Sequence, residues 1–334
     1  MSIIFKTFFA VVVLLFAILL CLFFIPVPQA KAALYGVDFS QMQAEALKLD
    51  WKQMYSAMLD DLGVKHIKLH TQWDFIEGTQ NNFYFDDVDW QLQQAESHGA
   101  DVIYVVGMKT GRWPECHIPD WAAGLSKEEQ QKDVLAYVQT IIERYKGNKA
   151  IVAWQAENEP LFNFGICPWY DANFLQQEVA LIHSLDPSRK VIISDSGESS
   201  LWLKAASIGD EVSSTLYRKV WMHISDSSGF YWTWPIPPSV YWVKAEIIQV
   251  FFHKKVIVGE LQAEPWNPTL FYNLPIQEQE QSMNLNQLKA NVLYAKETGL
   301  DEFYLWGVEW WYWLKVTNAD PTIWAYAKTL FTAP

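Results

Sequence analysis

Short apolar runs alternate with longer amphipathic segments from Leu34 to the C-terminal region. The runs are rich in β-branched and aromatic residues, as buried strands are, and they lie at 34–39, 66–70, 101–107, 150–156, 190–195, 211–221, 255–260 and 302–307. The amphipathic segments predict helices at 43–62, 86–98, 126–146, 170–185, 199–208, 239–253, 277–298 and 319–331. Eight strands that alternate with eight helices predict an α/β fold of the (β/α)₈ TIM barrel type.

The length of the chain fits one large domain. Its 334 residues are 51% hydrophobic, enough for a single core, and no low-complexity linker divides the repeated units. We therefore expect residues 33–334 to form one barrel domain.

The first 32 residues have a different character. Lys6 is followed by an apolar stretch from about Phe8 to Ile25, which is long enough to span a bilayer, and "AKAA" at 30–33 resembles a signal-peptide cleavage site. These features predict a signal peptide or a membrane anchor, whereas a buried core helix is disfavoured. In either case we expect the rest of the chain to be exported, so that only an uncleaved N-terminal segment would contact a membrane.

Charge and composition exclude several partners and cofactors. The net charge is −13 and no Lys/Arg run is present, so we do not expect the chain to bind nucleic acid. The seven histidines show no metal-ligand spacing, which disfavours a metal-dependent hydrolase, and we expect neither a metal nor another cofactor. Aromatic residues make up 16% of the chain, and such rings suit flat, amphipathic ligands such as sugars.

Carboxylates follow three of the expected strands. Glu157 and Glu159 come after the fourth strand, Glu260 and Glu264 at the end of the seventh, and Glu309 after the eighth. In a (β/α)₈ barrel the active site lies at the C-terminal ends of the strands, so these acids converge there. A pair of carboxyl groups with separated pKa values is what glycoside hydrolysis needs.

The stretch "WQAENEP" at 154–160, set opposite "VIVGELQ" at 256–262, resembles the clan of retaining (β/α)₈ glycoside hydrolases. That clan includes cellulase-like family 5, β-galactosidase family 42 and family 39. The resemblance implies that Glu159 is the acid/base, Asn158 the partner of the sugar 2-hydroxyl, and Glu260 the nucleophile. Glu264 is a rival for the nucleophile, and Glu157 either tunes the pKa of Glu159 or braces the strand.

Further segments carry the same resemblance. "STLYRKVW" implies that Tyr217 orients the nucleophile, and "LWGVEWW" implies that Trp306 forms the floor of the catalytic subsite. Many clan members carry an arginine on the second strand, where this chain offers only Lys68 or His70. His70 is either a site residue or a packed histidine.

Aromatic loops follow several strands, which favours a cleft lined by rings that stack on sugars. The candidate rings are Trp73, Trp113, Trp232, Trp266 and Trp310. Cys116 and Cys167 fall in the loops after the third and fourth strands, which are neighbours in a barrel, and we predict a disulfide between them.

These observations predict a retaining glycoside hydrolase that cleaves β-linked sugars by double displacement. The carboxyls of Glu159 and Glu260 are then expected roughly 5–5.5 Å apart. A catalytically silent carbohydrate-binding barrel at the cell surface is the alternative, because the second strand has no arginine.

Overall fold

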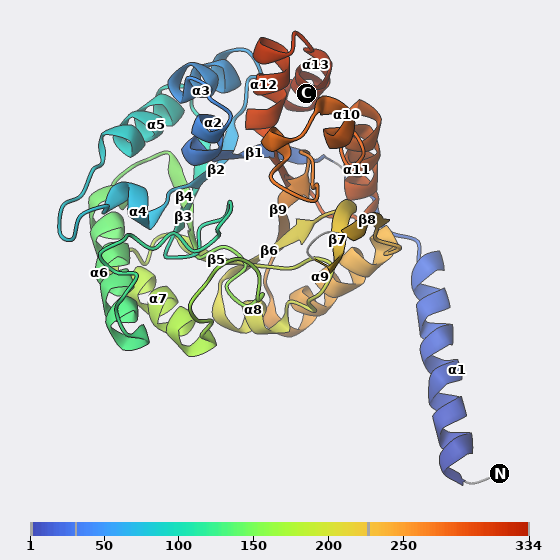
Figure 1. Cartoon of the computed structure of the whole chain (residues 1–334). Coiled ribbons are helices and arrows are strands. Elements are labelled where there is room, and N and C mark those ends of the chain that lie inside the picture. Colours follow the sequence, from blue (N-terminus) through green and yellow to red (C-terminus); the bar gives the residue numbers. More distant parts are fainter. Residues whose placement is uncertain (1–2, 31, 226–227, 333–334) are drawn as a thin grey trace.

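The computed structural model describes residues 3–30, 32–225 and 228–332. Eight parallel strands close into a barrel in the order β1-β10-β9-β6-β5-β4-β3-β2, and helices surround it (Figure 1). The barrel strands are β1 (Leu34–Ser40), β2 (His66–His70), β3 (Asp101–Val106), β4 (Ile151–Ala156), β5 (Lys190–Asp195), β6 (Glu211–Leu216), β9 (Val256–Gln262) and β10 (Glu302–Trp306). The predicted (β/α)₈ barrel is confirmed.

Helices follow the strands, and the longer ones pack around the outside of the barrel with their apolar faces inward. They are α2 (Gln41–Ala46), α3 (Trp51–Asp60), α4 (Trp73–Ile76), α5 (Asp86–Ser97), α6 (Lys127–Tyr145), α7 (Ala172–Leu185), α8 (Leu203–Ile208), α9 (Pro238–Phe252), α10 (Ile276–Gln279), α11 (Leu285–Glu297), α12 (Val308–Thr317) and α13 (Thr322–Phe331). A short 3₁₀ turn, η1 (Phe271–Asn273), precedes α10. Ser126 begins α6 with a capping box that includes Glu129, so the local sequence specifies where this helix starts.

Two of the predicted helices are each divided in the structure. The expected helix 43–62 breaks at Lys48, whose φ of 58° is left-handed, and Asp50 caps the new helix α3. The expected helix 277–298 ends early at Gln279, and Asn284 caps α11. At both breaks, a residue that caps the next helix lies inside a stretch whose apolar residues keep their helical spacing. The spacing alone therefore does not reveal the break.

The expected strand 211–221 is too long. It ends at Leu216, and β7 (Lys219–Ser225) then pairs antiparallel with β8 (Ser228–Thr233) in a hairpin outside the barrel. Helix α12, which directly follows β10, was not predicted.

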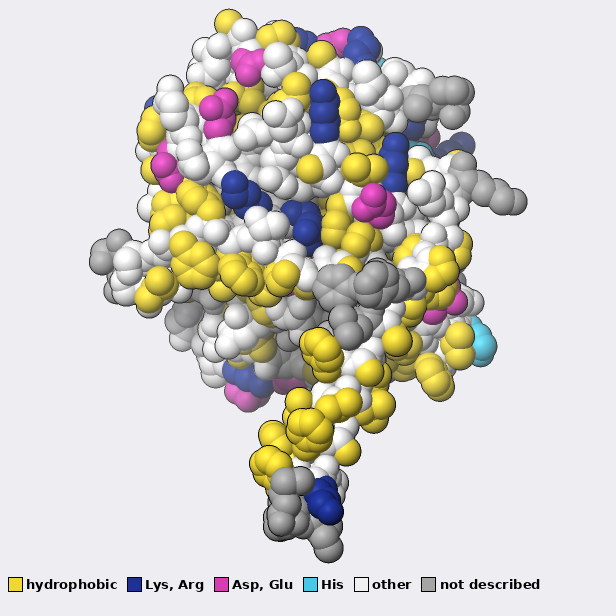
Figure 2. Space-filling view, turned by 90° about the vertical axis from the view of Figure 1, so that its right-hand side faces the viewer, with side chains coloured by type: hydrophobic (Ala, Val, Ile, Leu, Met, Phe, Trp, Pro, Cys, Tyr) yellow, Lys and Arg dark blue, Asp and Glu magenta, His cyan; other side chains and the backbone are white. Residues whose placement is uncertain are grey.

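The N-terminal segment forms the helix α1 (Ile3–Phe24), which extends away from the barrel and carries hydrophobic side chains along its surface (Figure 2). Among the residues that the structure describes, no helix meets the length and hydropathy expected of a membrane span. Lys31, in the expected cleavage site, lies outside the described residues. Cleavage and export stay predictions.

The interior of the barrel differs from the layer between strands and helices. Ile103, Ala153, Ile192, Ile257 and Tyr304 form a small buried cluster of their own, separate from the large core between strands and helices. Closer to the C-terminal ends of the strands, the buried residues become polar, and this change marks the candidate site.

Candidate active site

Glu260 reaches the barrel interior because β9 contains a bulge. The register of β9 with β6 shifts by one residue between Val258 and Glu260, which leaves Gly259 as the extra residue. A Cβ atom on Gly259 would lie 1.9 Å from Ser213 Oγ, so any larger residue here would force the Ser213 side chain to move. The bulge therefore turns Glu260 toward the residues at the mouth.

The carboxylate of Glu260 is held by two donors. Lys68 Nζ lies 3.3 Å from Oε1, and the hydroxyl of Tyr217 donates to Oε2 at 2.9 Å. Burial opposes ionisation of Glu260, but the charge of Lys68 and these hydrogen bonds outweigh it, so the pKa is lowered. Glu260 is thus kept ionised, as a nucleophile must be.

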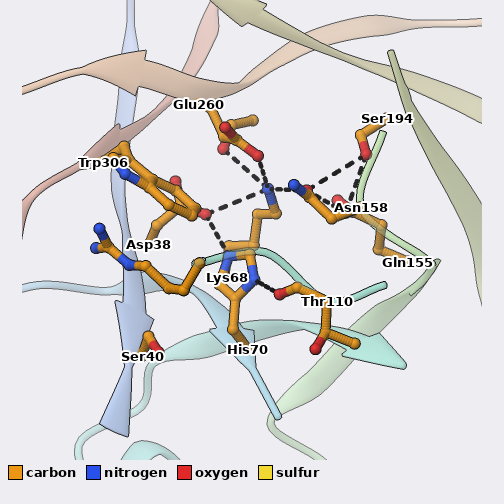
Figure 3. Close-up of polar contacts among 12 residues, drawn as sticks. Asp38, Ser40, Lys68, His70, Thr110, Gln155, Asn158, Ser194, Glu260 and Trp306 are labelled. Atoms are coloured by element: carbon orange, nitrogen blue, oxygen red, sulfur yellow. Dashed lines mark hydrogen bonds and ion pairs between the residues drawn. The ribbon is translucent and has the colours of Figure 1, made fainter. Parts of the chain in front are cut away.

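Lys68 connects several strands at the centre of the site. Its Nζ also lies 3.2 Å from Asp38 Oδ1 and 3.5 Å from Asn158 Oδ1, as Figure 3 shows. Lys68 is buried, and the neighbouring carboxylates overcome its desolvation and raise its pKa. It places a positive charge beside Glu260 on the second strand, where the resembled clan often has an arginine and where this chain offers only Lys68 or His70.

Glu159 follows β4 in a constrained backbone. Its φ is 43°, its N–H donates to Ser194 Oγ at 2.7 Å, and Lys109 Nζ donates to its carbonyl oxygen at 2.9 Å. The carboxyl itself accepts a hydrogen bond from Thr215 Oγ1 at 3.4 Å. These contacts hold the side chain at the mouth of the barrel.

The environments of Glu159 and Glu260 push their pKa values apart. Burial and the negative charge of Glu260 raise the pKa of Glu159 well above its usual value. Thr215, which touches Glu159, lies opposite Glu260 in the β6–β9 register, so the two carboxyls share one end of the barrel. These opposite shifts favour a protonated Glu159 beside an ionised Glu260, which is the combination that glycoside hydrolysis requires.

Glycosyl hydrolase family 10 is the family whose model matches this chain, over residues 33–220, more than half of its length. The chain belongs to this family. The matched region contains Asn158, Glu159 and Tyr217, whereas Glu260 lies beyond it.

Solved structures share the barrel of this family 10 chain at low sequence identity. A β-galactosidase from Rahnella sp. R3 has a TM-score of 0.58 and 13% identity, with 84% of this chain and 52% of that chain covered. A GH5_18 variant from Bifidobacterium longum, solved in complex with Manb1-4GlcNAc, has a TM-score of 0.57 and 13% identity, covering 82% and 68%. The predicted relationship to (β/α)₈ glycoside hydrolases is confirmed.

One curated relative matches a short part of the chain. A probable mannan endo-1,4-beta-mannosidase A from Aspergillus niger is 32% identical over 76 residues, which cover 22% of this chain and 18% of that protein. This chain thus spans about half of the Rahnella β-galactosidase and a smaller part of the mannosidase.

Asn158 precedes Glu159 and contacts Lys68 in this family 10 chain. Its amide oxygen accepts from Gln155 Nε2 at 3.3 Å as well as from Lys68, so its NH₂ group is left to act as a donor. That amide lowers the pKa of Glu115, which burial raises to about 7. Asn158 is placed to donate to a ligand between Glu115 and Lys68.

The side chain of Glu157 is directed toward the loop after β3. Its carboxylate accepts the backbone N–H of Met108 at 2.8 Å and that of Lys109, both in the loop after β3. Burial raises the pKa of Glu157, although a hydrogen bond with its other neighbour, Glu178 on α7, opposes this effect. Glu157 therefore braces the β3 loop against β4.

His70 is buried within the site. Its Nε2 lies 2.8 Å from Asp38 Oδ1, and its Nδ1 contacts the carbonyl of Thr110. Burial and the charge of Lys68 lower the pKa of His70 well below its usual value, which keeps the ring neutral. His70 positions Asp38 and the Thr110 loop.

Arg112 was not among the residues singled out from the sequence. Its guanidinium contacts the carboxylates of Glu264 and Glu309 and lies 4.0 Å from the ring centroid of Trp306. Trp306 Nε1 donates to Glu264 Oε1 at 2.8 Å. Glu264, the rival nucleophile, is thus occupied by an ion pair and an indole hydrogen bond.

Three of the predicted aromatic residues line the mouth or its surroundings. Trp266 packs edge-on against Tyr217 at 5.0 Å between ring centroids, and Phe164 links it to Trp113. Trp232 lies on the β7–β8 hairpin, partly exposed.

Trp73 and Trp310 are corrections to the sequence prediction. Both are fully buried in the core, where their indole N–H groups donate to Glu77 and Gln279. Trp73 is the first residue of α4 and Trp310 lies within α12, and each ring is on the inward face of its helix. A sugar therefore cannot reach either ring.

A disulfide joins Cys116 to Cys167, the pair expected from the sequence. It connects the loop after β3 to the loop after β4, beside Glu115 and Asn158. Within the described residues, no group of three or more His, Cys, Asp or Glu side chains could hold a metal ion.

Proposed function

We propose that this family 10 chain hydrolyses β-glycosidic bonds with retention of configuration, with Glu260 as nucleophile and Glu159 as acid/base. The observation that carries the proposal is the placement of the two carboxyls at one end of the barrel, where Lys68 and Tyr217 hold Glu260, and where their pKa values shift in opposite directions.

In the first step, a carboxylate oxygen of Glu260 forms a bond to the anomeric carbon. The bond from that carbon to the leaving oxygen breaks, and Glu159 gives its proton to this oxygen. A glycosyl ester on Glu260 and a free alcohol result. Loss of the Glu260 charge then removes one cause of the raised pKa of Glu159, which suits Glu159 for its next role.

In the second step, Glu159 takes a proton from water, and the water oxygen attacks the anomeric carbon. The ester bond breaks, and Glu260 leaves as a carboxylate with its Lys68 and Tyr217 contacts restored. Two inversions at one carbon give net retention.

The substrate we propose is a β-linked oligo- or polysaccharide of neutral hexoses. Within the described part of the chain, Asp38 Oδ2, Glu115 Oε2 and Glu264 Oε2 are buried acceptors without a hydrogen-bond partner. Sugar hydroxyls are donors that satisfy such oxygens. The names of the relatives, a mannosidase and a β-galactosidase, support manno- or galacto-configured substrates.

We propose in addition that the chain is exported, because of its apolar N-terminal segment and the small residues that follow it. A carbohydrate polymer outside the cell is a substrate that an exported enzyme meets.

A silent carbohydrate-binding barrel was considered because the second strand has no arginine. Lys68 weakens this argument, because its ammonium group lies beside Glu260 and supplies a positive charge there. Incubation with 4-nitrophenyl β-mannoside, β-galactoside and β-glucoside distinguishes the two: an enzyme releases nitrophenol from at least one of them, and a binding protein releases none. The Glu260→Ala variant is the control for contaminating activity.

A further inference from the structure

We infer that one end of the substrate cleft is closed by the bridge from Arg112 to Glu264 and Glu309, so that the enzyme removes single sugars from the non-reducing end of its substrate. The inference rests on the proposed function and adds to it the mode of attack.

The bridge spans one half of the barrel mouth. Arg112 lies in the loop after β3, Glu264 follows β9, and Glu309 lies in α12. On the closed barrel, β2, β1 and β10 lie between β3 and β9 on this side. A side chain that joins the β3 loop to the β9 loop therefore crosses the ends of three strands.

Each of these three strand ends is covered by the bridge or by its partners. At β2, His70 contacts the carbonyl of Thr110, close to Gly111. At β1, the N–H of Ser40 donates to Glu309 Oε1 at 2.7 Å. At β10, the guanidinium of Arg112 lies against the ring of Trp306.

The covered half is tightly closed. Arg112 is 5% exposed, Glu264 and Trp306 are 7% exposed, and Glu309 is 0% exposed. Arg112 occupies one face of the Trp306 indole, so that face is not free to stack on a second sugar. The sugar that reacts can contact Asp38, Lys68 and Glu260, and the chain has no path beyond them on this side.

The other half of the mouth carries the acid and an aromatic wall. Glu159 follows β4, and the leaving group must extend toward this proton donor. Trp113, which is 49% exposed, together with Phe164 and Trp266 forms a row of rings there. Arg112 and Trp113 are adjacent in the sequence, but Arg112 closes one half of the barrel mouth and Trp113 lines the other half.

The direction of cleavage follows from these two halves. The sugar whose anomeric carbon reacts lies in the closed half, and the part that leaves with the glycosidic oxygen lies in the open half. A closed end beside the first and the half-exposed ring of Trp113 beside the second select the terminal, non-reducing sugar.

Two chromogenic substrates test the inference on the full-length protein. The 4-nitrophenyl β-monoside and β-1,4-bioside of the same sugar, mannose, galactose or glucose, are compared by continuous nitrophenol release and by chromatography of the products. We expect immediate release from the monoside. From the bioside we expect a lag, with the free monosaccharide and the nitrophenyl monoside as first products.

Nitrophenol release from the bioside without a lag, with the intact disaccharide as co-product, would overturn the inference while leaving the proposed hydrolase in place. If neither compound is cleaved for any sugar, the proposed function fails and the inference with it. The two failures are therefore distinguishable.

Variants locate the effect at the bridge. In Arg112→Ala, we expect the share of direct disaccharide release to rise by about tenfold or more, because the blocked half is opened. Arg144→Ala is the matched control, since Arg144 also pairs with an acid and packs on aromatic rings but lies on α6. If Arg112→Ala folds and keeps the lag, the bridge does not close the cleft; if it does not fold, the lag of the unmodified protein decides.

Discussion

The ammonium group of Lys68 lies 3.3 Å from Oε1 of Glu260 inside the barrel, with both side chains almost completely buried. The positive charge lowers the pKa of Glu260 against the effect of burial. We expect Lys68→Met to raise that pKa, so the acid limb of the pH–rate profile moves to higher pH. We also expect kcat/KM on an aryl β-glycoside to fall roughly a hundredfold or more.

Lys68→Arg is the matched control for this prediction, because it keeps the positive charge. We expect its acid limb to stay where the unmodified protein has it. An acid limb that is the same in Lys68→Met and in the unmodified protein would show that Lys68 does not set the ionisation of Glu260.

The pH dependence of activity follows from the opposite shifts of the two carboxyls. Glu260 must be ionised and has a lowered pKa, so activity is lost on the acid side only below the usual carboxyl range. Glu159 must be protonated, and burial and the charge of Glu260 raise its pKa, so activity is lost as the pH rises through that raised value. We expect a bell-shaped kcat/KM profile with a broad plateau.

Glu159→Gln separates the basic limb from the rest of the profile. With a substrate whose leaving group needs no proton, such as 2,4-dinitrophenyl β-glycoside, we expect this variant to form the glycosyl ester without a basic limb. With an unactivated disaccharide we expect a loss of roughly 10²–10⁴-fold. Equal losses on both substrates would argue against the acid role of Glu159.

Glu157 is expected to act on structure rather than on ionisation. Glu157→Gln leaves one of the Met108 and Lys109 N–H groups without an oxygen acceptor, so we expect a loss of about 1–3 kcal/mol of stability. Thermal unfolding measures this loss. The basic limb of the pH–rate profile should not move, and a shift of that limb would instead assign Glu157 to tuning Glu159.

Gly107 provides an independent test of the same brace. Its φ is +128°, and a Cβ atom there would overlap the carboxyl of Glu157. We expect Gly107→Ala to lower the thermal midpoint and to reduce kcat, because the β3 loop must shift. Gly147→Ala is the control, since no heavy atom lies within 4 Å of its Cβ position.

The disulfide between Cys116 and Cys167 closes a loop with a sequence separation of 51 residues. A loop of that length corresponds to about 4 kcal/mol of stabilisation in the chain-entropy model. We expect the double variant Cys116→Ser with Cys167→Ser to unfold at a lower temperature, whereas Cys21→Ser, at an exposed free cysteine, should not. If a thiol assay on the oxidised protein finds that Cys116 and Cys167 both react, the pairing is contradicted.

Much of the fold could be predicted because apolar residues are spaced differently along buried strands and along amphipathic helices. All eight barrel strands lie within or near the expected segments, since buried β-branched runs are bounded by turns. The errors occur where a local backbone feature interrupts a continuing apolar pattern. Lys48 adopts a left-handed conformation within one apolar pattern, and Asn284 caps a helix within another.

The two carboxyls that we propose as the catalytic pair could be chosen from the sequence, but the network around them could not. Glu159 and Glu260 stand at strand ends and carry a family resemblance. Asp38 and Arg112 do not, because their role depends on which strands become neighbours when the barrel closes. Trp73 and Trp310 were misplaced because a tryptophan in a short helix after a strand packs inward as readily as outward.

Mass spectrometry of the trapped intermediate tests the roles of the two carboxyls. The protein is incubated with a 2-deoxy-2-fluoro β-glycosyl fluoride of the sugar it hydrolyses, digested, and sequenced by fragmentation. We expect one fluoroglycosyl adduct on Glu260, formed with loss of fluoride, and no adduct in Glu260→Ala. An adduct on Glu264 or Glu159, or inverted product configuration with no adduct, would contradict the assignment of Glu260 as nucleophile.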